Sequence, residues 1–216
     1  MDALFAGLLS PAAFARAKAY PKTKIIVLVG PSGAGKGTAV EKLRERRPDI
    51  FVPVSATTRD PRDGNEVDGE HYLFVTVEKF QELLADGRIM TGDGYAGSGG
   101  LYGDFWPDDS HELILLEITV DAALVVQKLF PEQTVIFAFL PPGLDERSWR
   151  RFLTKRLKFR NTEDDETIKR RVKRGIEEIR AMRAAPEIIP IYNQDTPNSV
   201  ETILAMLRRL KILQEQ

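Results

Sequence analysis

The chain has 216 residues, of which 43% are hydrophobic and 29% charged, a composition typical of one globular domain with room for a small inserted lobe. Lys and Arg number 31 against 32 Asp and Glu, so no net positive field predicts a nucleic-acid or membrane partner. The chain contains no cysteine, which excludes disulfides, thiolate metal sites and cysteine nucleophiles and fits a cytoplasmic protein. The sequence leaves the oligomeric state open.

Residues 1–23 are predicted to form an N-terminal extension. They begin with an acidic residue, Asp2, and lack both a basic start and an apolar run long enough to cross a bilayer, so we expect neither a signal peptide nor a membrane segment. Ser10 and Pro11 predict the cap and first turn of a short helix that ends before Pro21.

Continuous apolar runs, separated by helical patterns, predict strands that are buried on both faces. Such a pattern indicates an α/β fold, with a parallel sheet flanked by helices. The strands are expected at Ile25–Val29, Phe51–Val54, Leu113–Ile118, Thr134–Leu140 and Glu187–Tyr192. The helices are expected at Lys36–Arg47, Val77–Asp86, Asp121–Phe130, Asp145–Arg160, Glu163–Ala184 and Ser199–Leu213.

Between residues 56 and 105 the pattern changes. This part contains the short alternating segment His71–Val75, many glycines and a single helical stretch. It predicts a small mixed lobe inserted into the α/β core.

The stretch GPSGAGKGT, residues 30–38, directly follows the apolar run that ends at Val29 and precedes a helical pattern. In this context, backbone N–H groups and the positive end of the helix form a concavity for phosphate, and Lys36 reaches the outer phosphates. The sequence therefore predicts a loop of the P-loop NTPase type that binds a nucleoside triphosphate, which the resemblance described below implies to be ATP. Its expected contacts are Gly30, Ser32, Gly33, Ala34, Gly35, Lys36, Gly37 and Thr38.

The residue after Lys36 is Gly37, where a P-loop usually carries a Ser or Thr that ligates magnesium, and Thr38 follows one position later. Two explanations compete. Either the Mg²⁺ that accompanies ATP is held mainly by phosphates and water, with Thr38 as a candidate ligand, or the metal site is degraded. We favour the first explanation because the lysine is intact.

A second anion site is predicted at residues 57–62, TTRDPR, after the second apolar run. Two guanidinium groups, Arg59 and Arg62, stand three residues apart around a stiffening proline and suit the dianionic oxygens of a phosphate monoester. The alternative is that both arginines are exposed and pair with Asp60 and Asp63. We favour the interpretation that these arginines bind the phosphate of an acceptor, because a phosphate loop on the same sheet already requires an acceptor site.

At this point the sequence resembles the guanylate kinase family, from about Lys24 to the C-terminus. The motifs that carry the resemblance are GPSGAGKGT, VSATTRDPRDGNEVDGEHYLFV, LYG at residues 101–103, LLEITVDAAL, FLPP at residues 139–142 and KRLKFRNTEDDETIKRRV. The TTRxPRxG block with a following GxxY is specific to this family among nucleoside monophosphate kinases.

The resemblance implies one guanylate kinase-like domain at residues 24–216, with a core, a lobe for the nucleoside monophosphate and an arginine-rich helical lid. The core comprises residues 24–55, 106–150 and 175–216, the lobe residues 56–105 and the lid residues 151–174. The implied activity is ATP-dependent phosphorylation of GMP to GDP with Mg²⁺, and dGMP is left open as a second acceptor. The alternatives are a kinase of the same fold for another nucleoside monophosphate or small phosphate ester, and a non-catalytic guanylate kinase-like binding module.

Carried over to this chain, the resemblance places Ser55 against the guanine and Arg59 and Arg62 on the GMP phosphate. Tyr72 and Tyr102 are expected to donate hydrogen bonds to the same phosphate. For Tyr72 the alternative is an aromatic core position on an alternating strand.

The family's lid positions match Arg156, Arg160 and Arg171, which are expected to converge on a phosphate chain. Thr162, followed by acidic residues, predicts the N-cap of a second lid helix and a hinge before it. The resemblance also places Asn193 near the adenosine of ATP, with an Asx-type turn as the alternative.

Phosphoryl transfer requires in-line positioning and neutralisation of charge rather than a covalent intermediate. The catalytic residues that the resemblance implies are Lys36, Arg59, Arg156, Arg160 and Arg171.

The match departs from the family at the base-binding positions. A family Glu that reads the adjacent N1–H and N2–H₂ donors of guanine aligns with Thr91 or, if the glycine-rich loop is aligned differently, with Asp93, which the chemistry favours. The family's paired acids appear as Glu117 and Thr119, and Glu117 can serve the base or the magnesium waters. Asp104 stands where the family has a small hydroxyl residue.

Overall fold

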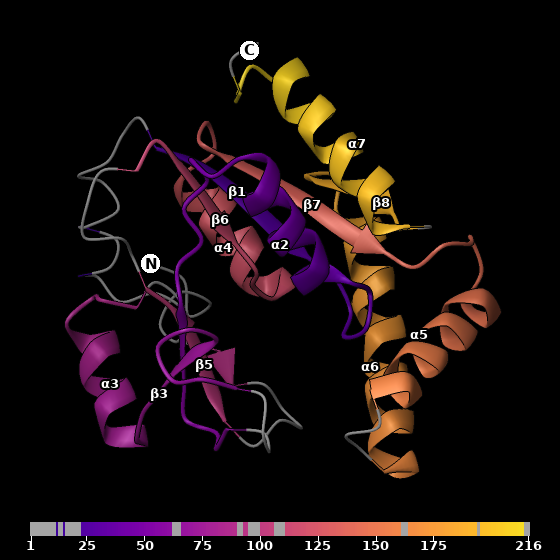
Figure 1. Cartoon of the computed structure of the whole chain (residues 1–216), viewed down its shortest axis with the longest axis horizontal. Helices are drawn as coiled ribbons and strands as arrows, with labels where there is room; N and C mark the ends of the chain where they lie inside the picture. The colour runs from indigo at the N-terminus through magenta and orange to yellow at the C-terminus, as the bar shows by residue number, and fades with distance from the viewer. Residues whose placement is uncertain are drawn as a thin grey trace. The chain divides into compact units, whose positions relative to one another are not determined.

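The computed structural model describes residues 12, 15, 23–61, 66–89, 93–94, 100–105, 111–160, 164–193 and 195–213 (Figure 1). At residues 93, 94 and 160 it describes the backbone alone. Of the predicted N-terminal helix, positions 12 and 15 are helical and the rest lies outside the described residues.

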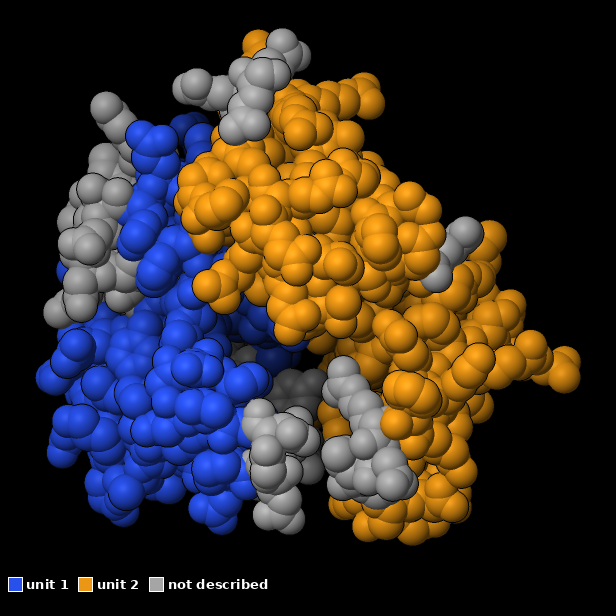
Figure 2. Space-filling view, in the orientation of Figure 1, with its two compact units in different colours: residues 1–25, 51–134 blue, residues 26–50, 135–216 orange. Residues whose placement is uncertain are grey.

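The chain forms two compact units, which Figure 2 colours separately. Unit 1 comprises residues 1–25 and 51–134, and unit 2 comprises residues 26–50 and 135–216. These boundaries differ from the predicted division into core, lobe and lid.

The larger sheet has the strand order β6-β1-β7-β8. Its strands are β1 (Lys24–Val29), β6 (Leu113–Leu116), β7 (Thr134–Leu140) and β8 (Ile188–Tyr192), and β7 pairs with β8 in parallel. Every residue of β6 and β7 is buried, which confirms the prediction of strands covered on both faces.

The helices of unit 2 are α2 (Lys36–Arg46), α5 (Glu146–Arg160), α6 (Asp165–Ala184) and α7 (Thr196–Arg209). Helix α5 packs against α6, and α2 packs against α7 (Figure 1). The α/β architecture predicted from the sequence is therefore confirmed.

Unit 1 contains a second, smaller sheet with the order β3-β2-β5-β4. Its strands are β2 (Ser55–Thr57), β3 (Tyr72–Phe74), β4 (Asp93–Gly94) and β5 (Leu101–Asp104). Strand β2 is parallel to β3 and antiparallel to β5, so this sheet is mixed, as predicted. The same unit holds α3 (Val77–Ala85) and α4 (Val120–Leu129).

The two faces of the small sheet differ in chemistry because successive side chains of a strand point to opposite faces. Ala56 of β2 is fully buried in an apolar cluster with Phe80 and Leu83 of α3, and Leu73 and Leu101 pack against that cluster.

Register places the other residues on the opposite face in two rows. One row is Tyr72, Ser55 and Asp104, and the other is Phe74, Thr57 and Tyr102. One face of the small sheet is thus occupied by a hydrophobic core, and the other carries polar and aromatic groups.

The strand predicted at Phe51–Val54 is wrong. Only Phe51 pairs, in an isolated bridge with Ile114, and the extended segment that follows enters the small sheet at Ser55. Pro53 interrupts the predicted strand because it has no N–H to donate to a neighbour.

Four helices begin at residues other than those predicted, and the displacement is one residue for α4 and α5, two for α6 and three for α7. Helix α6 is capped by Asp164, which accepts a hydrogen bond from the Thr167 backbone N–H at 2.6 Å, so the predicted cap at Thr162 is wrong. Helix α7 begins before Ser199 because Asp195 caps it and Pro197 stands in its first turn, where the missing N–H costs no helical hydrogen bond.

Candidate active site

The phosphate loop lies between β1 and α2 and requires glycine at two positions. Gly33 and Gly35 adopt left-handed φ values of 87° and 99°. A Cβ on Gly35 would lie 2.8 Å from Asn193 Nδ2 and 3.0 Å from Arg156 Nη2. The loop backbone is therefore in close contact with polar groups that the rest of unit 2 supplies.

Hydrogen bonds from two side chains of unit 2 brace the loop. Lys36 Nζ donates to the Gly30 carbonyl at 2.8 Å, and Asn193 Nδ2 donates to the Ala34 carbonyl at 2.7 Å. Asn193 Oδ1 also accepts from Ser199 Oγ at 3.1 Å. Asn193 is buried and holds the loop, so its predicted contact with adenosine stays a prediction, and the Asx-type turn belongs to Asp195.

Two of the three predicted lid arginines lie at this loop. Arg171 of α6 donates a hydrogen bond to Ser32 Oγ, and Arg156 Nε of α5 donates to the Gly33 carbonyl at 3.4 Å. Helix α6 approaches so closely that a Cβ on Gly175 would lie 3.1 Å from Pro31 Cβ. The side chain of Arg160 lies outside the described residues.

Glu178, a residue that the sequence analysis did not single out, belongs to the same cluster of charges. Its Oε1 accepts a hydrogen bond from Arg174 Nε at 2.9 Å. Burial raises the pKa of Glu178 above its ordinary value of 4.5, while the hydrogen bond from Arg174 and the charges of Lys36 and Arg171 lower it. Glu178 is thus a carboxylate counter-ion within the field of two predicted catalytic cations.

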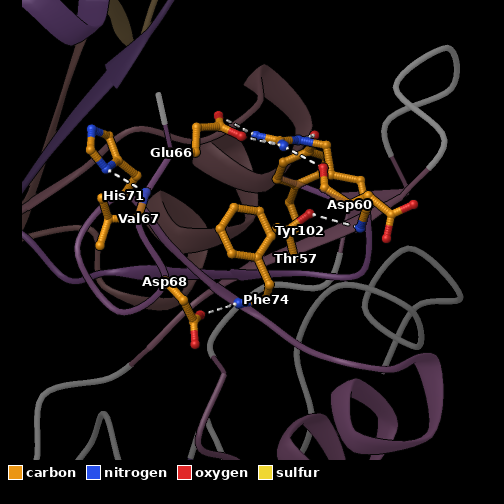
Figure 3. A network of polar contacts seen from close by, with 9 residues as sticks. Thr57, Asp60, Glu66, Val67, Asp68, His71, Phe74 and Tyr102 are labelled. Carbon is orange, nitrogen blue, oxygen red and sulfur yellow. Dashed lines mark hydrogen bonds and ion pairs between the residues drawn. The ribbon is translucent and has the colours of Figure 1, made fainter. Parts of the chain in front are cut away.

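Arg59 is the centre of a polar network on unit 1 (Figure 3). Its Nη1 and Nη2 donate to the two carboxylate oxygens of Glu66 at 2.6 Å each, and its Nε donates to the Tyr102 hydroxyl at 2.9 Å. The hydrogen bonds to Glu66 raise the pKa of Arg59 above its usual range, so the guanidinium remains charged.

Aromatic rings surround the same guanidinium. Arg59 Cζ lies 5.0 Å from the centre of the Tyr72 ring and 5.5 Å from that of Phe74, distances that permit cation–π attraction. The Tyr72 and Tyr102 rings meet edge to face at 5.9 Å. Tyr72 therefore lies beside Arg59, on the face of the sheet opposite α3, and not in the apolar cluster.

Glu66 was missed by the sequence analysis. It lies seven residues after Arg59, and no periodicity links the two. No signal in the sequence marks it, because the need for a nearby acid follows from the burial of the Arg59 side chain, which is only 8% exposed in the structure.

The predicted base-binding residues are described in part. Ser55 Oγ donates to Asp104 Oδ1 at 2.5 Å, across the β2–β5 pair. Thr119 caps α4 by accepting from the Ala122 N–H at 3.4 Å, and Glu117 is exposed just after β6. Arg62 and Thr91 lie outside the described residues, as does the side chain of Asp93, whose backbone pairs with Tyr102.

Searches for a membrane span and for a metal cluster covered the same described ranges. None of their helices is both long and apolar enough to cross a bilayer. Nor do those ranges contain a group of three or more His, Cys, Asp or Glu residues arranged to hold a metal ion.

The family model described as guanylate kinase matches residues 22–209. The chain belongs to the guanylate kinase family. The guanylate kinase of Synechococcus sp. (strain CC9311) is 42% identical over 188 residues, which cover 85% of this chain and 90% of the relative. That of Oceanobacillus iheyensis is 34% identical over 196 residues, covering 89% and 90%.

A crystal structure of guanylate kinase from Anaplasma phagocytophilum has the same fold. Its TM-score is 0.65 at 26% identity, and the match covers 90% of this chain and 89% of the other. The resemblance stated from the motifs is therefore confirmed, and the chain is a nucleoside monophosphate kinase of this family.

Replacing Glu66 by glutamine tests whether this acid positions Arg59. A glutamine there would present an N–H₂ group to the guanidinium and lose the bidentate pair, so we expect the KM for GMP to rise about tenfold with a smaller change in kcat. Steady-state kinetics with saturating ATP measure both constants. Glu82→Gln, an exposed acid of the same unit paired with Lys79, is the matched control. A KM for GMP that stays the same or falls would contradict the positioning role.

Replacing Glu178 by glutamine tests the role of this half-buried counter-ion through the pH dependence of stability. Because the pKa of Glu178 is raised in the folded protein, its contribution to stability is greatest below about pH 4.5 and decreases as the pH rises through the folded pKa. The free energy of unfolding of the wild type minus that of Glu178→Gln should therefore fall as the pH rises above about 4.5.

Urea unfolding at a series of pH values measures this difference. Glu177→Gln, an exposed acid on the same helix, is the control. A difference that rises with pH would show that the cations around Glu178 outweigh its burial.

Proposed function

We infer that this chain, a guanylate kinase, converts ATP and GMP to ADP and GDP by direct in-line phosphoryl transfer. The observation that carries the mechanism is the contact of Arg156 and Arg171 with the phosphate loop that contains Lys36. A non-catalytic binding module does not require such a set of cations around an intact phosphate loop, so we consider that alternative the weakest.

For the donor, we propose that residues 30–38 and Lys36 hold the phosphates of ATP. Backbone N–H groups at the start of α2 point into the loop, and the positive helix end adds attraction for an anion. Arg156, Arg160 and Arg171 neutralise the charge that develops on the transferred group. Asn193 supports this site by fixing the Ala34 carbonyl.

For the acceptor, we propose that Arg59, Arg62, Tyr72 and Tyr102 hold the phosphate of GMP. Arg59 is charged and fixed in orientation before the substrate arrives, which reduces the entropy lost on binding. Ser55, Asp93, Glu117 and Thr119 are the proposed contacts for guanosine. Residues 56–105 form the proposed acceptor lobe, and residues 151–174 form the lid.

In the transfer step an oxygen of the GMP phosphate forms a bond to the γ-phosphorus of ATP while the bond from that phosphorus to the bridging oxygen of ADP breaks. Negative charge is spread over the equatorial oxygens, so fixed cations and N–H donors stabilise it. Closure of the lid excludes water, which would otherwise accept the phosphoryl group.

Magnesium is proposed to enter as the MgATP complex. The residues present fit this mode, since a Cβ on Gly37 would meet no atom within 4 Å and thus leaves room for a hydrated ion. When bound, the ion would neutralise negative charge on the phosphate oxygens of ATP. Thr38 is exposed at this position and is the proposed protein contact.

We also propose a cytoplasmic location, which the cysteine-free composition favours.

An assay of ADP release with GMP, dGMP, AMP, CMP and UMP tests the function. We expect GMP to have the highest kcat/KM, and Lys36→Ala to lower kcat at least about 100-fold because a charge on the outer phosphates is lost. Lys42→Ala, on the same helix and paired with Glu45, is the control. Absence of turnover with every acceptor would refute the kinase, and preference for another base would indicate a kinase of the same fold that acts on another nucleoside monophosphate.

Replacing Gly37 by serine tests how magnesium is held. The added hydroxyl lies where a P-loop usually ligates the ion, so we expect the half-saturating Mg²⁺ concentration to fall severalfold with little change in kcat. Gly37→Ala adds the same Cβ without the hydroxyl and serves as the matched control. An equal response of the two variants would show that the hydroxyl has no access to the ion.

A further inference from the structure

His71 is an exposed histidine in the polar network around Arg59, and the proposed function gives it no role (Figure 3). It lies directly before β3 and binds Val67 through both its side chain and its backbone. His71 Nδ1 accepts a hydrogen bond from the Val67 N–H at 3.2 Å, and the His71 N–H donates to the Val67 carbonyl at 3.1 Å. His71 thus closes a turn that begins immediately after Glu66.

The hydrogen bond from Val67 to the imidazole also orients Glu66. The Val67 N–H belongs to the peptide group that joins the two residues, and this group is planar, so fixing its N–H also fixes the Glu66 carbonyl. The other end of the turn is attached to β3, because Asp68 Oδ1 accepts from the Phe74 N–H at 2.9 Å. The backbone that carries Glu66 is therefore held to the strand that follows His71.

Glu66 transmits this order to Arg59. Its carboxylate binds the guanidinium through two hydrogen bonds of 2.6 Å, and both side chains are largely buried. The Tyr72 and Phe74 rings of β3 lie against the same guanidinium. The turn that His71 closes thus joins the acid that binds Arg59 to the strand whose rings contact it.

The contact with Val67 requires one protonation state of the imidazole. Nδ1 accepts a hydrogen bond only in the neutral ring with its proton on Nε2, because both nitrogens of an imidazolium are donors. After protonation, an Nδ1–H group would face the Val67 N–H. Histidine changes its charge between about pH 5 and pH 8, so this contact is open to titration near neutral pH.

The charged groups of this region already take part in other contacts or are exposed. Glu66 binds Arg59, the Asp68 carboxylate binds the Phe74 N–H, and Glu70 is exposed on the turn itself. On β3 the titratable group is Tyr72, whose ring lies against Arg59. Protonation of the imidazole therefore acts first on its hydrogen bond with Val67.

We propose that neutral His71 is a positioning residue for the acceptor phosphate and acts through Val67 and Glu66 on Arg59. The assignment rests on the proposed function, because it takes Arg59 as a group that binds the phosphate of GMP. A proton taken from solvent by Nδ1 breaks the hydrogen bond from the Val67 N–H and releases the Glu66 backbone. Arg59 is then less firmly oriented before GMP arrives, and binding costs more entropy.

The competing explanation is that His71 only stabilises the turn. Two substitutions separate the roles. In His71→Asn the amide Oδ1 can take the place of Nδ1, accepts a hydrogen bond and does not titrate, so the acceptor is kept at every pH. In His71→Ala the acceptor is absent at every pH.

The experiment measures kcat and the KM for GMP of the wild type and of His71→Asn, with saturating ATP, from about pH 5.5 to about pH 8. The ratio of the two KM values cancels the ionisation of the GMP phosphate and of every group that the two enzymes share. We expect this ratio to be near one at about pH 8 and to rise at least about threefold at about pH 5.5, with a constant ratio of kcat values. His71→Ala should raise the KM severalfold relative to the wild type at about pH 8.

His111→Asn is the control, because it removes the other histidine of the chain, whose ring stacks on Phe51, and it should keep the pH profile of the wild type. A KM ratio that does not change with pH would overturn the assignment. So would a lowered thermal midpoint of His71→Ala with an unchanged KM, because that result indicates a structural role alone. Failure of the proposed function is distinguishable, since the wild-type enzyme would then show no turnover of GMP at all.

Discussion

The cations that we propose to bind phosphate are held in place by acceptors of the chain itself, and the rest of the proposed site depends on this constraint. In unit 1 the Arg59 guanidinium is bound by Glu66 and Tyr102. In unit 2 the ammonium of Lys36 is bound by a loop carbonyl and Arg171 by a hydroxyl of the same loop. Each cation is therefore oriented before the substrate arrives, and less side-chain entropy is lost on binding.

Strand alternation in the small sheet puts the groups that we propose to face the acceptor on one side of the sheet. Because β2 is only three residues long and is paired on both sides, its single inward residue, Ala56, is enough to attach the sheet to the core under α3. Ser55 and Thr57 consequently share the other face with their neighbours in β3 and β5. A shift of one residue in register would move these side chains into the apolar cluster.

The sequence predicted the parts of this site that local pattern determines. The phosphate loop follows from a strand, glycines and a lysine at fixed spacing, and Arg156 and Arg171 lie at that loop, in accord with the lid expectation. Counter-ions were not predicted, because no local pattern links Glu66 to Arg59 and Glu178 lies 142 positions after Lys36, so only the fold brings that pair together. The wrong prediction of a strand at residues 51–54 has a local cause. The prediction gave more weight to the apolar residues of this segment than to its proline, which cannot donate a backbone hydrogen bond.

A crystal structure with GMP and a non-hydrolysable ATP analogue would test the central claim most directly. We predict that Arg59 and Tyr102 lie within about 3 Å of the GMP phosphate oxygens while Glu66 still holds the guanidinium, and that the donor phosphates contact residues 30–38 at similar distances. A GMP phosphate bound away from Arg59, or an Arg59 that has left Glu66 to bind it, would contradict the claim that the chain fixes its phosphate-binding cations before the substrates arrive.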